Sequence, residues 1–593
     1  MKEGFKTWRS CVDSFGDIVA YQLVSKAVLA ILLMLLKKLA MMALASTGRV
    51  AVTTGDFLFL FTTWQGILLL LFGLVSLYLY VAVDINTKII FANKFLKNEK
   101  YTPLSLLKES FAELPRFFNV GGTLIVLFVS LLAPLTGVGL YISLTRNLKI
   151  PTFISSVIQS TPLYRVIYYV AITVLIVVAL LHIFSIFAIV IDNLKPREAF
   201  ALSRCMMKTN WQSYLKQSFL FFLSMLVNAL FVIAIIALLL FVLYFCARDL
   251  VMSHERMFFV FVVLLIIVGA SLFNYIGSFC YIVQMSWMYY TYREREDEIP
   301  VERSRKHNLF FAVSNLFILG LLVFSSYVID TYFDQVFVNE ISVSVIAHRG
   351  GGSEAPENTV EGIRKAILLG VYGSEIDIQR TSDGYYIVNH DGTFSRLCNV
   401  NKKPEEMTLA EVKELTISDP LYPDQQEPVA TFEEMLEAAK GNVVLFTELK
   451  GNTADQQMVD DAVALIRQYE MEDECVLISL KYDIIDYAEM TYPEIQTAYL
   501  MFASFGDVAS LNCDFLGLEE ETATPITVDA IHNQNKKVLV WTPNTTESQR
   551  YFLLSAADAI ITDNVSQANG LIEELRNRSD ITIFLDFVAS LFY

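Results

Sequence analysis

The chain has 593 residues, too many for one ordinary domain, and 54% of them are apolar, which favours a membrane protein. Its charge is divided unevenly. Residues 1–340 hold 28 basic and 20 acidic residues, a net charge of +8, whereas residues 341–593 hold 17 basic and 42 acidic residues, a net charge of −25. The composition therefore predicts an apolar, basic membrane region followed by an acidic soluble domain. Such a domain repels phosphate overall, which excludes nucleic-acid binding as its general function.

Seven apolar stretches in the first region are long enough to cross a bilayer, which takes about 20 residues. The first is interrupted by Lys26, Lys37 and Lys38, so it can also be a tilted or partly interfacial helix. The stretches lie near residues 18–45, 64–83, 119–144, 163–192, 218–245, 257–285 and 309–329. We therefore expect a multi-pass transmembrane helical domain over residues 1–335.

The charge of the loops predicts the orientation of this domain. Loops 85–118, 193–217 and 292–308 carry 6, 5 and 5 Lys and Arg residues, whereas loops 46–63, 145–162 and 246–256 carry 1, 2 and 2. Because basic loops stay in the cytoplasm, the N-terminus is expected to be cytoplasmic, and seven crossings make the C-terminal domain extracellular. If the first stretch does not cross, the soluble domain is cytoplasmic instead.

Short apolar runs alternate with helical patterns after residue 341. Buried parallel strands read as continuous apolar runs, so this alternation predicts a parallel α/β sheet. Nine strands are expected, at residues 342–347, 373–378, 386–389, 443–447, 475–479, 496–501, 515–518, 537–541 and 559–562. A domain of about 250 residues suits a TIM (β/α)8 barrel, so one of these strands is expected outside the barrel.

The soluble region is therefore divided into two parts. We assign the barrel to residues 341–579 and an apolar C-terminal tail to residues 580–593. The tail contains one acidic residue, Asp586. It either lies in the membrane interface as an amphipathic helix or packs on the protein.

Three carboxylates at the strand ends mark a candidate metal site. Glu375 and Asp377 are two residues apart on one strand, so alternation sends both side chains to the same face. Glu448, at the end of another strand, completes a set of oxygen ligands, which suits Mg²⁺ or Ca²⁺ rather than zinc. The alternative is a group of solvated surface acids, but the apolar Ile376 between the first two favours burial.

Two histidines and two basic residues fall at the same strand ends. His348 and His390 can act as general base and general acid across a phosphorus centre. Arg349 can hold two phosphate oxygens with its planar guanidinium, and Lys450 can offset negative charge as a point cation. A single histidine after a strand is more often structural, but two of them beside three acids and two cations favour catalysis.

These residues belong to a longer series of ordered motifs. The series resembles the glycerophosphodiester phosphodiesterase family over residues 345–575, and the apolar front resembles the membrane domain fused to some bacterial members. The matching motifs are His348-Arg349-Gly350, Pro356-Glu357-Asn358-Thr359, Glu375-Ile376-Asp377, Thr381-Ser382-Asp383-Gly384, His390-Asp391 with Arg396, Glu448-Leu449-Lys450, Trp541-Thr542-Pro543-Asn544 and Ile561-Thr562-Asp563. Pro543 and Ala557 depart from the usual residues, at positions outside the metal set.

The resemblance implies a TIM barrel that hydrolyses phosphodiesters with one divalent cation, Ca²⁺ or Mg²⁺. It also implies three roles for residues of these motifs. The implied roles are acid–base catalysis for His348 and His390, substrate binding for Arg349, Lys450 and Trp541, and metal binding for Glu375, Asp377 and Glu448.

The expected function is metal-dependent hydrolysis of glycerophosphodiester bonds at the outer surface of a bacterial cell membrane, which releases an alcohol and glycerol 3-phosphate. About twenty residues separate His348 from the last apolar stretch, so the barrel stays close to the bilayer. This favours phosphatidylglycerol or lipoteichoic acid-type polymers over soluble glycerophosphodiesters as substrates. A second hypothesis is a membrane transporter or lipid-handling protein with a ligand-binding barrel, because seven helices exceed what a tether needs.

Overall fold

The computed structural model describes residues 15–54, 58–127, 154–155, 158–159, 161–299, 309–337 and 339–591. The chain forms two compact units. One consists mainly of the helices that precede Phe337, and the other consists of residues 337–593 together with residues 39–69 and 151–155 from the first part of the chain.

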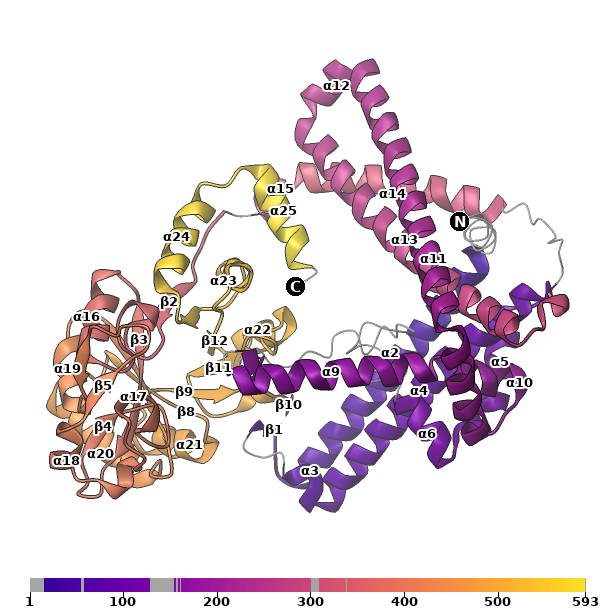
Figure 1. The fold of residues 1–593 in the computed structure, drawn as a ribbon. Helices are drawn as coiled ribbons and strands as arrows, with labels where there is room; N and C mark the ends of the chain where they lie inside the picture. The colour runs from indigo at the N-terminus through magenta and orange to yellow at the C-terminus, as the bar shows by residue number, and fades with distance from the viewer. Residues whose placement is uncertain are drawn as a thin grey trace. The chain divides into compact units, whose positions relative to one another are not determined.

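Long apolar helices dominate the chain before Phe337 (Figure 1). The long helices are α2 (Phe15–Ser46), α4 (Trp64–Leu96), α9 (Pro162–His182), α11 (Pro196–Cys246), α13 (Glu255–Tyr292) and α14 (Leu309–Thr331). The shorter helices are α3 (Phe59–Thr62), α5 (Pro103–Glu113), η2 (Leu114–Phe117), α6 (Val120–Leu127), α10 (Ser185–Asp192), α12 (Arg248–Ser253), η4 (Glu296–Glu298) and α15 (Phe333–Val336).

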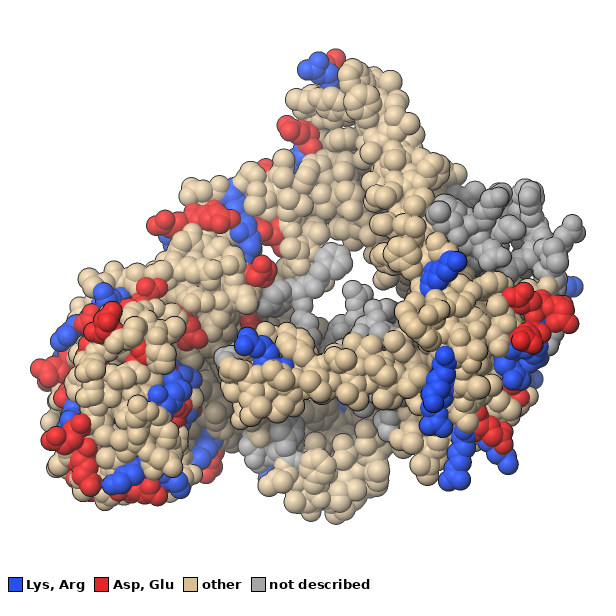
Figure 2. All heavy atoms as spheres, in the orientation of Figure 1, with Lys and Arg blue, Asp and Glu red and all other residues tan. Residues whose placement is uncertain are grey.

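Five spans in the described part of the chain are long and apolar enough to cross a membrane. They are Ile18–Ser46, Trp64–Leu96, Pro162–Asp192, Pro196–Cys246 and Glu255–Tyr292. Each contains one of the expected stretches. The stretch 309–329 falls in α14, whose apolar part is shorter, Asn315–Thr331, and most of the stretch 119–144 lies outside the described residues. In Figure 2 long parts of these helices carry few charged side chains, as a lipid-facing surface does.

Eight parallel strands close into a barrel in the second unit, which confirms the expected TIM fold. Their order is β2-β13-β12-β11-β9-β8-β7-β3, and β2 pairs with β3 to close the ring. The strands are β2 (Ser344–Ala347), β3 (Gly373–Arg380), β7 (Val444–Leu449), β8 (Cys475–Ser479), β9 (Gln496–Met501), β11 (Phe515–Glu519), β12 (Lys537–Trp541) and β13 (Ala559–Thr562). The ninth expected strand is β4 (Tyr386–Val388), which pairs antiparallel with the end of β3 and lies outside the ring.

Alternation along the strands divides the apolar side chains between two cores. Ile346, Phe446 and Leu500 fill the barrel interior, whereas their neighbours Leu445 and Tyr499 belong to the core beneath the outer helices. The outer helices are α16 (Val360–Leu368), α19 (Phe432–Ala439), α20 (Gln456–Gln468), α21 (Tyr482–Thr491), α22 (Pro525–His532), α23 (Thr546–Leu553) and α24 (Val565–Arg576). Packing on both sides of the sheet holds the strands in place, and with them the polar motifs at the strand ends.

Shorter elements lie in the loops of the second unit. Those that follow His390 surround a small core that includes Phe394 and Ile417. They are α17 (Ser395–Cys398), η6 (Pro404–Glu406), α18 (Leu409–Lys413), β5 (Thr416–Ser418) and β6 (Gln426–Pro428). The others are η5 (Gly352–Glu354), β10 (Ser504–Gly506), η7 (Val508–Ser510) and β1 (Ala51–Thr53), which pairs with β10.

The C-terminal tail forms helix α25 (Asp580–Ser590). Its Asp586 accepts hydrogen bonds from Arg550 Nε at 2.8 Å and from Arg578 Nη1 at 2.7 Å, and Phe584 is buried. Leu585 lies on the exposed side. One side of the tail therefore packs on its own unit, and the other side is apolar and exposed.

Candidate active site

Most of the expected site residues lie at the carboxyl-terminal ends of barrel strands, the face that carries the active site in TIM barrels, whereas Glu375 and Asp377 lie within β3 and His390 follows β4. His348 and Arg349 follow β2, and Lys450 follows β7. His390 comes two residues after β4, and Trp541 is the last residue of β12. The closed ring thus brings together side chains that are up to 193 residues apart in the sequence.

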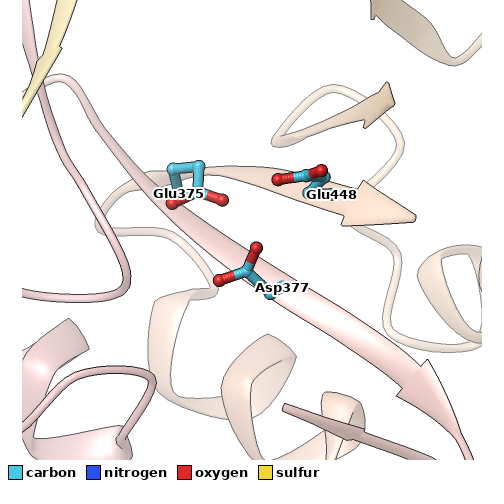
Figure 3. A group of neighbouring side chains, drawn as sticks. All are labelled: Glu375, Asp377 and Glu448. Carbon is cyan, nitrogen blue, oxygen red and sulfur yellow. The ribbon is translucent and has the colours of Figure 1, made fainter. Parts of the chain in front are cut away.

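The three carboxylates form one buried cluster (Figure 3). Glu375, Asp377 and Glu448 are 3%, 1% and 6% exposed, and one oxygen from each lies within 4.8 Å of the others. Asp377 and Glu448 are direct register partners on β3 and β7. Asn358 Nδ2 donates to Asp377 Oδ2 at 2.9 Å, and Lys450 Nζ donates to Asp377 Oδ1 at 2.9 Å. Lys450 Nζ also donates to Glu448 Oε2 at 3.1 Å, so its ammonium group bridges two of the three carboxylates.

The electrostatics of this cluster fit a divalent cation. Burial, together with the charges of Asp377 and Glu448, raises the pKa of Glu375 well above its ordinary value. Burial also raises the pKa of Glu448 to about 7, although Lys450 acts in the opposite direction. One ammonium group does not balance three buried carboxylates, so a divalent cation would complete the charge balance. An all-oxygen donor set can hold Mg²⁺ or Ca²⁺.

Each of the two histidines has its own aspartate. His348 Nδ1 lies 2.7 Å from Asp563 Oδ1, and His390 Nδ1 lies 2.9 Å from Asp391 Oδ1. Burial raises the pKa of Asp563, but the charge and hydrogen bond of His348 outweigh it and the pKa falls to about 2. An ionised aspartate at Nδ1 orients the imidazole and leaves Nε2 for proton transfer. His348 Nε2 lies 3.8 Å from Glu375 Oε2, at the edge of the acidic cluster.

Arg349 combines backbone and side-chain contacts at the centre of the site. Its N–H donates to Glu375 Oε2 at 2.8 Å, and its Nη1 donates to Glu357 Oε2 at 3.2 Å. Its Nε is buried and has no hydrogen-bond partner among the described residues. Because buried donors are normally paired, this Nε–H is open to an anionic ligand such as a phosphate oxygen.

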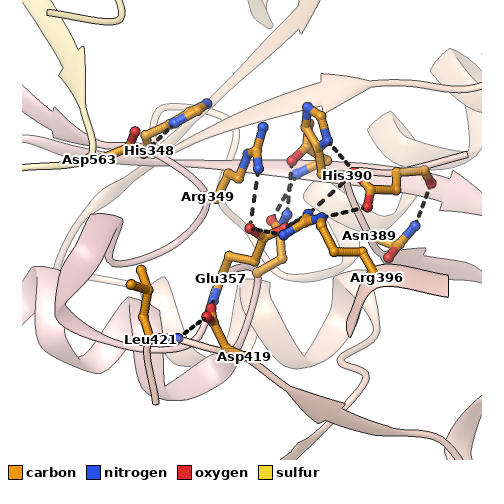
Figure 4. Close-up of polar contacts among 12 residues, drawn as sticks. His348, Arg349, Glu357, Asn389, His390, Arg396, Asp419, Leu421 and Asp563 are labelled. Carbon is orange, nitrogen blue, oxygen red and sulfur yellow. Dashed lines mark hydrogen bonds and ion pairs between the residues drawn. The ribbon is translucent and has the colours of Figure 1, made fainter. Parts of the chain in front are cut away.

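A chain of ion pairs links the second histidine to this arginine (Figure 4). Asp391, the partner of His390, accepts from Arg396 Nε at 2.7 Å. Arg396 Nη1 in turn donates to Glu357 Oε2 at 2.9 Å, the oxygen that Arg349 also contacts. Burial raises the pKa of Glu357, but the hydrogen bond from Arg396 and the charge of Arg349 lower it below its ordinary value. The carboxylate therefore stays ionised and positions both arginines.

Trp541 lies at the top of the barrel interior. Its ring packs against the interior core, and its Nε1 donates to Gly517 O at 3.1 Å on the neighbouring strand β11. Trp541 is half-buried at the end of its strand. This position suits the role that the resemblance implies for it.

Several residues of the site carried no predicted role. Asp391 and Asp563 stood in the quoted motifs, yet their pairing with the two histidines is visible only in three dimensions. Glu357 and Arg396 likewise meet across 39 residues. A sequence signal existed in each case, because each of these charged residues lies in one of the quoted motifs, but nothing in the spacing indicated its partner.

The fold and the site define a class of protein, a TIM-barrel phosphodiesterase with a helical membrane domain. A family model described as "Glycerophosphoryl diester phosphodiesterase family" matches residues 348–567. A second, described as "Membrane domain of glycerophosphoryl diester phosphodiesterase", matches residues 5–325, more than half of the chain. The chain therefore belongs to the glycerophosphoryl diester phosphodiesterase family, in the form that carries this membrane domain, and it is a glycerophosphodiester phosphodiesterase.

Individual proteins are similar to the barrel. A glycerophosphodiester phosphodiesterase of Caldanaerobacter subterraneus is 26% identical over 238 residues, 39% of this chain and 98% of that protein. Mouse glycerophosphodiester phosphodiesterase 1 is 35% identical over 123 residues, 20% of this chain and 37% of that protein. A solved structure of an Oleispira antarctica phosphodiesterase, in complex with the product sn-glycerol-3-phosphate, is 26% identical in sequence. The match covers 39% of this chain and 96% of that chain, with a TM-score of 0.36.

Proposed function

We propose that this enzyme uses one divalent cation, Ca²⁺ or Mg²⁺, to hydrolyse glycerophosphodiesters at the outer surface of a bacterial cell membrane. The products are an alcohol and glycerol 3-phosphate. The substrates are membrane or envelope phosphodiesters, such as phosphatidylglycerol and lipoteichoic acid-type polymers, or soluble glycerophosphodiesters. The observation that carries the proposal is a buried triad of carboxylates beside two histidines, each oriented by its own aspartate.

The proposed reaction divides proton transfer between the two histidines. One imidazole takes the proton of the attacking water or neighbouring glycerol hydroxyl, and the other gives a proton to the leaving alkoxide as its P–O bond breaks. The Nδ1 contacts of His348 with Asp563 and of His390 with Asp391 keep both Nε2 atoms available for these transfers. Asp563 and Asp391 also stabilise the imidazolium that forms when a proton is taken up.

Three further side chains bind the substrate in this proposal. Arg349 donates its unpaired Nε–H to a phosphate oxygen, and Lys450 offsets negative charge that develops on the phosphate. Trp541 supplies an apolar wall for the alcohol portion. A cation held by Glu375, Asp377 and Glu448 would polarise the phosphoryl oxygens when bound.

The proposed location depends on the orientation of the membrane domain, residues 1–335. The basic loops on one side of the predicted spans favour a cytoplasmic N-terminus, and seven crossings then make the barrel, residues 341–579, extracellular. Labelling of intact cells with a membrane-impermeant reagent tests this. Labelling of the barrel in intact cells supports the proposal, and labelling only after the cells are opened contradicts it.

The function is tested with the purified full-length chain and glycerophosphoglycerol as substrate, by measuring released glycerol 3-phosphate in the presence of Mg²⁺ or Ca²⁺. His348→Ala and His390→Ala are each expected to lower kcat by about 100-fold or more. His532→Ala is the matched control, because this histidine also pairs with an aspartate, Asp558, at 2.9 Å but lies on α22. Wild-type rates in either site variant would contradict the proposed roles.

A further inference from the structure

A short strand from the loop between the first two apolar helices pairs with the catalytic barrel. β1 and β10 are antiparallel, with Ala51 opposite Gly506 and Thr53 opposite Ser504. Asp507 N donates to Val50 O at 3.0 Å, which extends the pairing by one residue. The two strands are about 450 residues apart in the sequence, so the loop between α2 and α4 is physically part of the barrel unit.

Side chains reinforce this strand pair. Tyr499 OH, on β9, donates to Thr53 Oγ1 at 2.6 Å. Thr54 Oγ1 accepts from Phe502 N at 3.1 Å and donates to Ala503 O at 3.3 Å. Val52, at 1% exposure, packs with Leu44 and Phe59 in a small core. β1 is therefore buried and hydrogen-bonded to the barrel unit, whereas the residues of β10 are exposed.

The pair lies on the active-site face of the barrel. β10 begins three residues after the end of β9, in the loop at the carboxyl-terminal end of that strand. In the closed ring β9 is four strands from β2 in either direction. The strand pair therefore forms the part of the rim that lies across the mouth from His348 and Arg349.

A short connection joins the first span to this part of the rim. Ala51 is five residues beyond Ser46, where α2 ends, and a fully extended chain of that length covers at most about 18 Å. The other connection, from Thr331 at the end of α14 to Ser344 at the start of β2, is 13 residues long, includes the short helix α15 and enters the barrel at its opposite face. The shorter tether is thus the one at the active-site face.

Exposed apolar side chains continue from the strand pair toward the second span. Leu58, Phe61 and Trp64 are 72%, 63% and 67% exposed, and Trp64 is the first residue of the span Trp64–Leu96. Aromatic and apolar residues at the end of a span are typical of the membrane–water interface. This patch, continuous with a predicted span, therefore fits the lipid surface as its partner.

We propose that the β1–β10 pair and the apolar patch at Leu58, Phe61 and Trp64 seat this part of the rim on the bilayer, so that the enzyme acts by preference on phosphodiesters whose alcohol portion stays embedded in the membrane. The inference rests on the proposed function and narrows it from glycerophosphodiesters in general to bilayer-held ones. The substrate crosses the rim at β10, and its phosphate reaches Arg349 on the far side of the mouth.

The test compares two substrates with the same phosphodiester, phosphatidylglycerol in vesicles and soluble glycerophosphoglycerol. The full-length enzyme is reconstituted in those vesicles with Mg²⁺ or Ca²⁺, and both rates are measured on each preparation. Thr54→Val removes the hydroxyl that bridges β1 to the barrel, and Phe61→Ser weakens the apolar patch without touching the strand pair. Thr331→Val is the control, since its hydroxyl donates to Tyr327 O within its own helix.

Both site variants are expected to lower the rate on phosphatidylglycerol by about tenfold and to leave the rate on glycerophosphoglycerol within about twofold of wild type. Equal effects on both substrates, or no effect on either, would overturn the inference. A wild-type enzyme that hydrolyses only glycerophosphoglycerol overturns it too while the proposed function stands. A wild-type enzyme that hydrolyses neither substrate overturns the proposed function itself.

Discussion

His348 Nδ1 lies 2.7 Å from Asp563 Oδ1, and the two residues are 215 positions apart, after the first and the last strand of the barrel. β2 and β13 are neighbours in the closed ring, so ring closure creates the pair. The aspartate also accepts from Asn544 Nδ2 at 2.6 Å, which fixes its orientation toward the imidazole.

Asp563→Asn tests whether this contact serves catalysis. The amide is neutral and no longer selects the imidazole tautomer with the proton on Nδ1, so kcat should fall by about 100-fold with little change in KM. The measurement is steady-state kinetics on glycerophosphoglycerol. Asp558→Asn, which alters the similar pair with His532, is the control and should retain wild-type kcat. Equal kcat in the two variants would mean that the Asp563 contact is structural.

Glu357→Gln should weaken substrate binding. The carboxylate contacts both Arg349 and Arg396, and without its charge the guanidinium of Arg349 loses its anchor. We expect kcat/KM to fall by about 10-fold to 100-fold, mainly through a higher KM.

Glu361→Gln is the control for this substitution. Glu361 forms long ion pairs with Arg364 and Lys365 on α16, and such surface pairs contribute little. An unchanged KM in Glu357→Gln would contradict the role of Glu357 in positioning Arg349.

The pH profile is expected to depend on His390. Burial lowers its pKa below the ordinary value, although the hydrogen bond to Asp391 and the charge of Asp377 act in the opposite direction. Asp391→Asn removes an interaction that raises the pKa, so the pKa of His390 should fall further. If His390 acts as the base, the acid limb of the kcat/KM profile moves to lower pH. If His390 acts as the acid, the alkaline limb of the profile moves to lower pH. A shift of that limb to higher pH would contradict the assignment.

Cation binding should stabilise the barrel. The three buried carboxylates repel one another, and a ligand that binds the folded state raises the melting temperature. At a cation concentration of about 100 times Kd we expect Tm to rise by roughly 5–10 °C in differential scanning fluorimetry. Asp377→Asn should lose most of this rise, whereas Asp383→Asn, outside the cluster, should keep it. An equal rise in both variants would place the cation elsewhere.

The barrel could be predicted because its signal is local. Continuous apolar runs such as 475–479 and 537–541 coincide with β8 and β12. The surplus strand was also expected, although only the antiparallel pairing with β3 identifies it as Tyr386–Val388. Two acids two residues apart on one strand indicated a shared face, and Glu375 and Asp377 do lie together.

Long-range pairings had no comparable signal. Ala51–Thr53 is a three-residue strand in a loop, and nothing near it in the sequence points to Ser504–Gly506. The partners of the two histidines likewise depend on ring closure and loop folding rather than on spacing. Sequence patterns thus indicated candidate site residues, and the fold was needed to show which of them touch.

We propose that a cation held by the buried carboxylates drives hydrolysis. The decisive measurement is glycerol 3-phosphate release from glycerophosphoglycerol by the full-length enzyme and by Glu375→Ala, before chelation, after chelation and after the cation is restored. We predict that chelation abolishes release, that Mg²⁺ or Ca²⁺ restores it, and that Glu375→Ala stays inactive throughout. Full release in the presence of chelator, or full activity in Glu375→Ala, would contradict the claim.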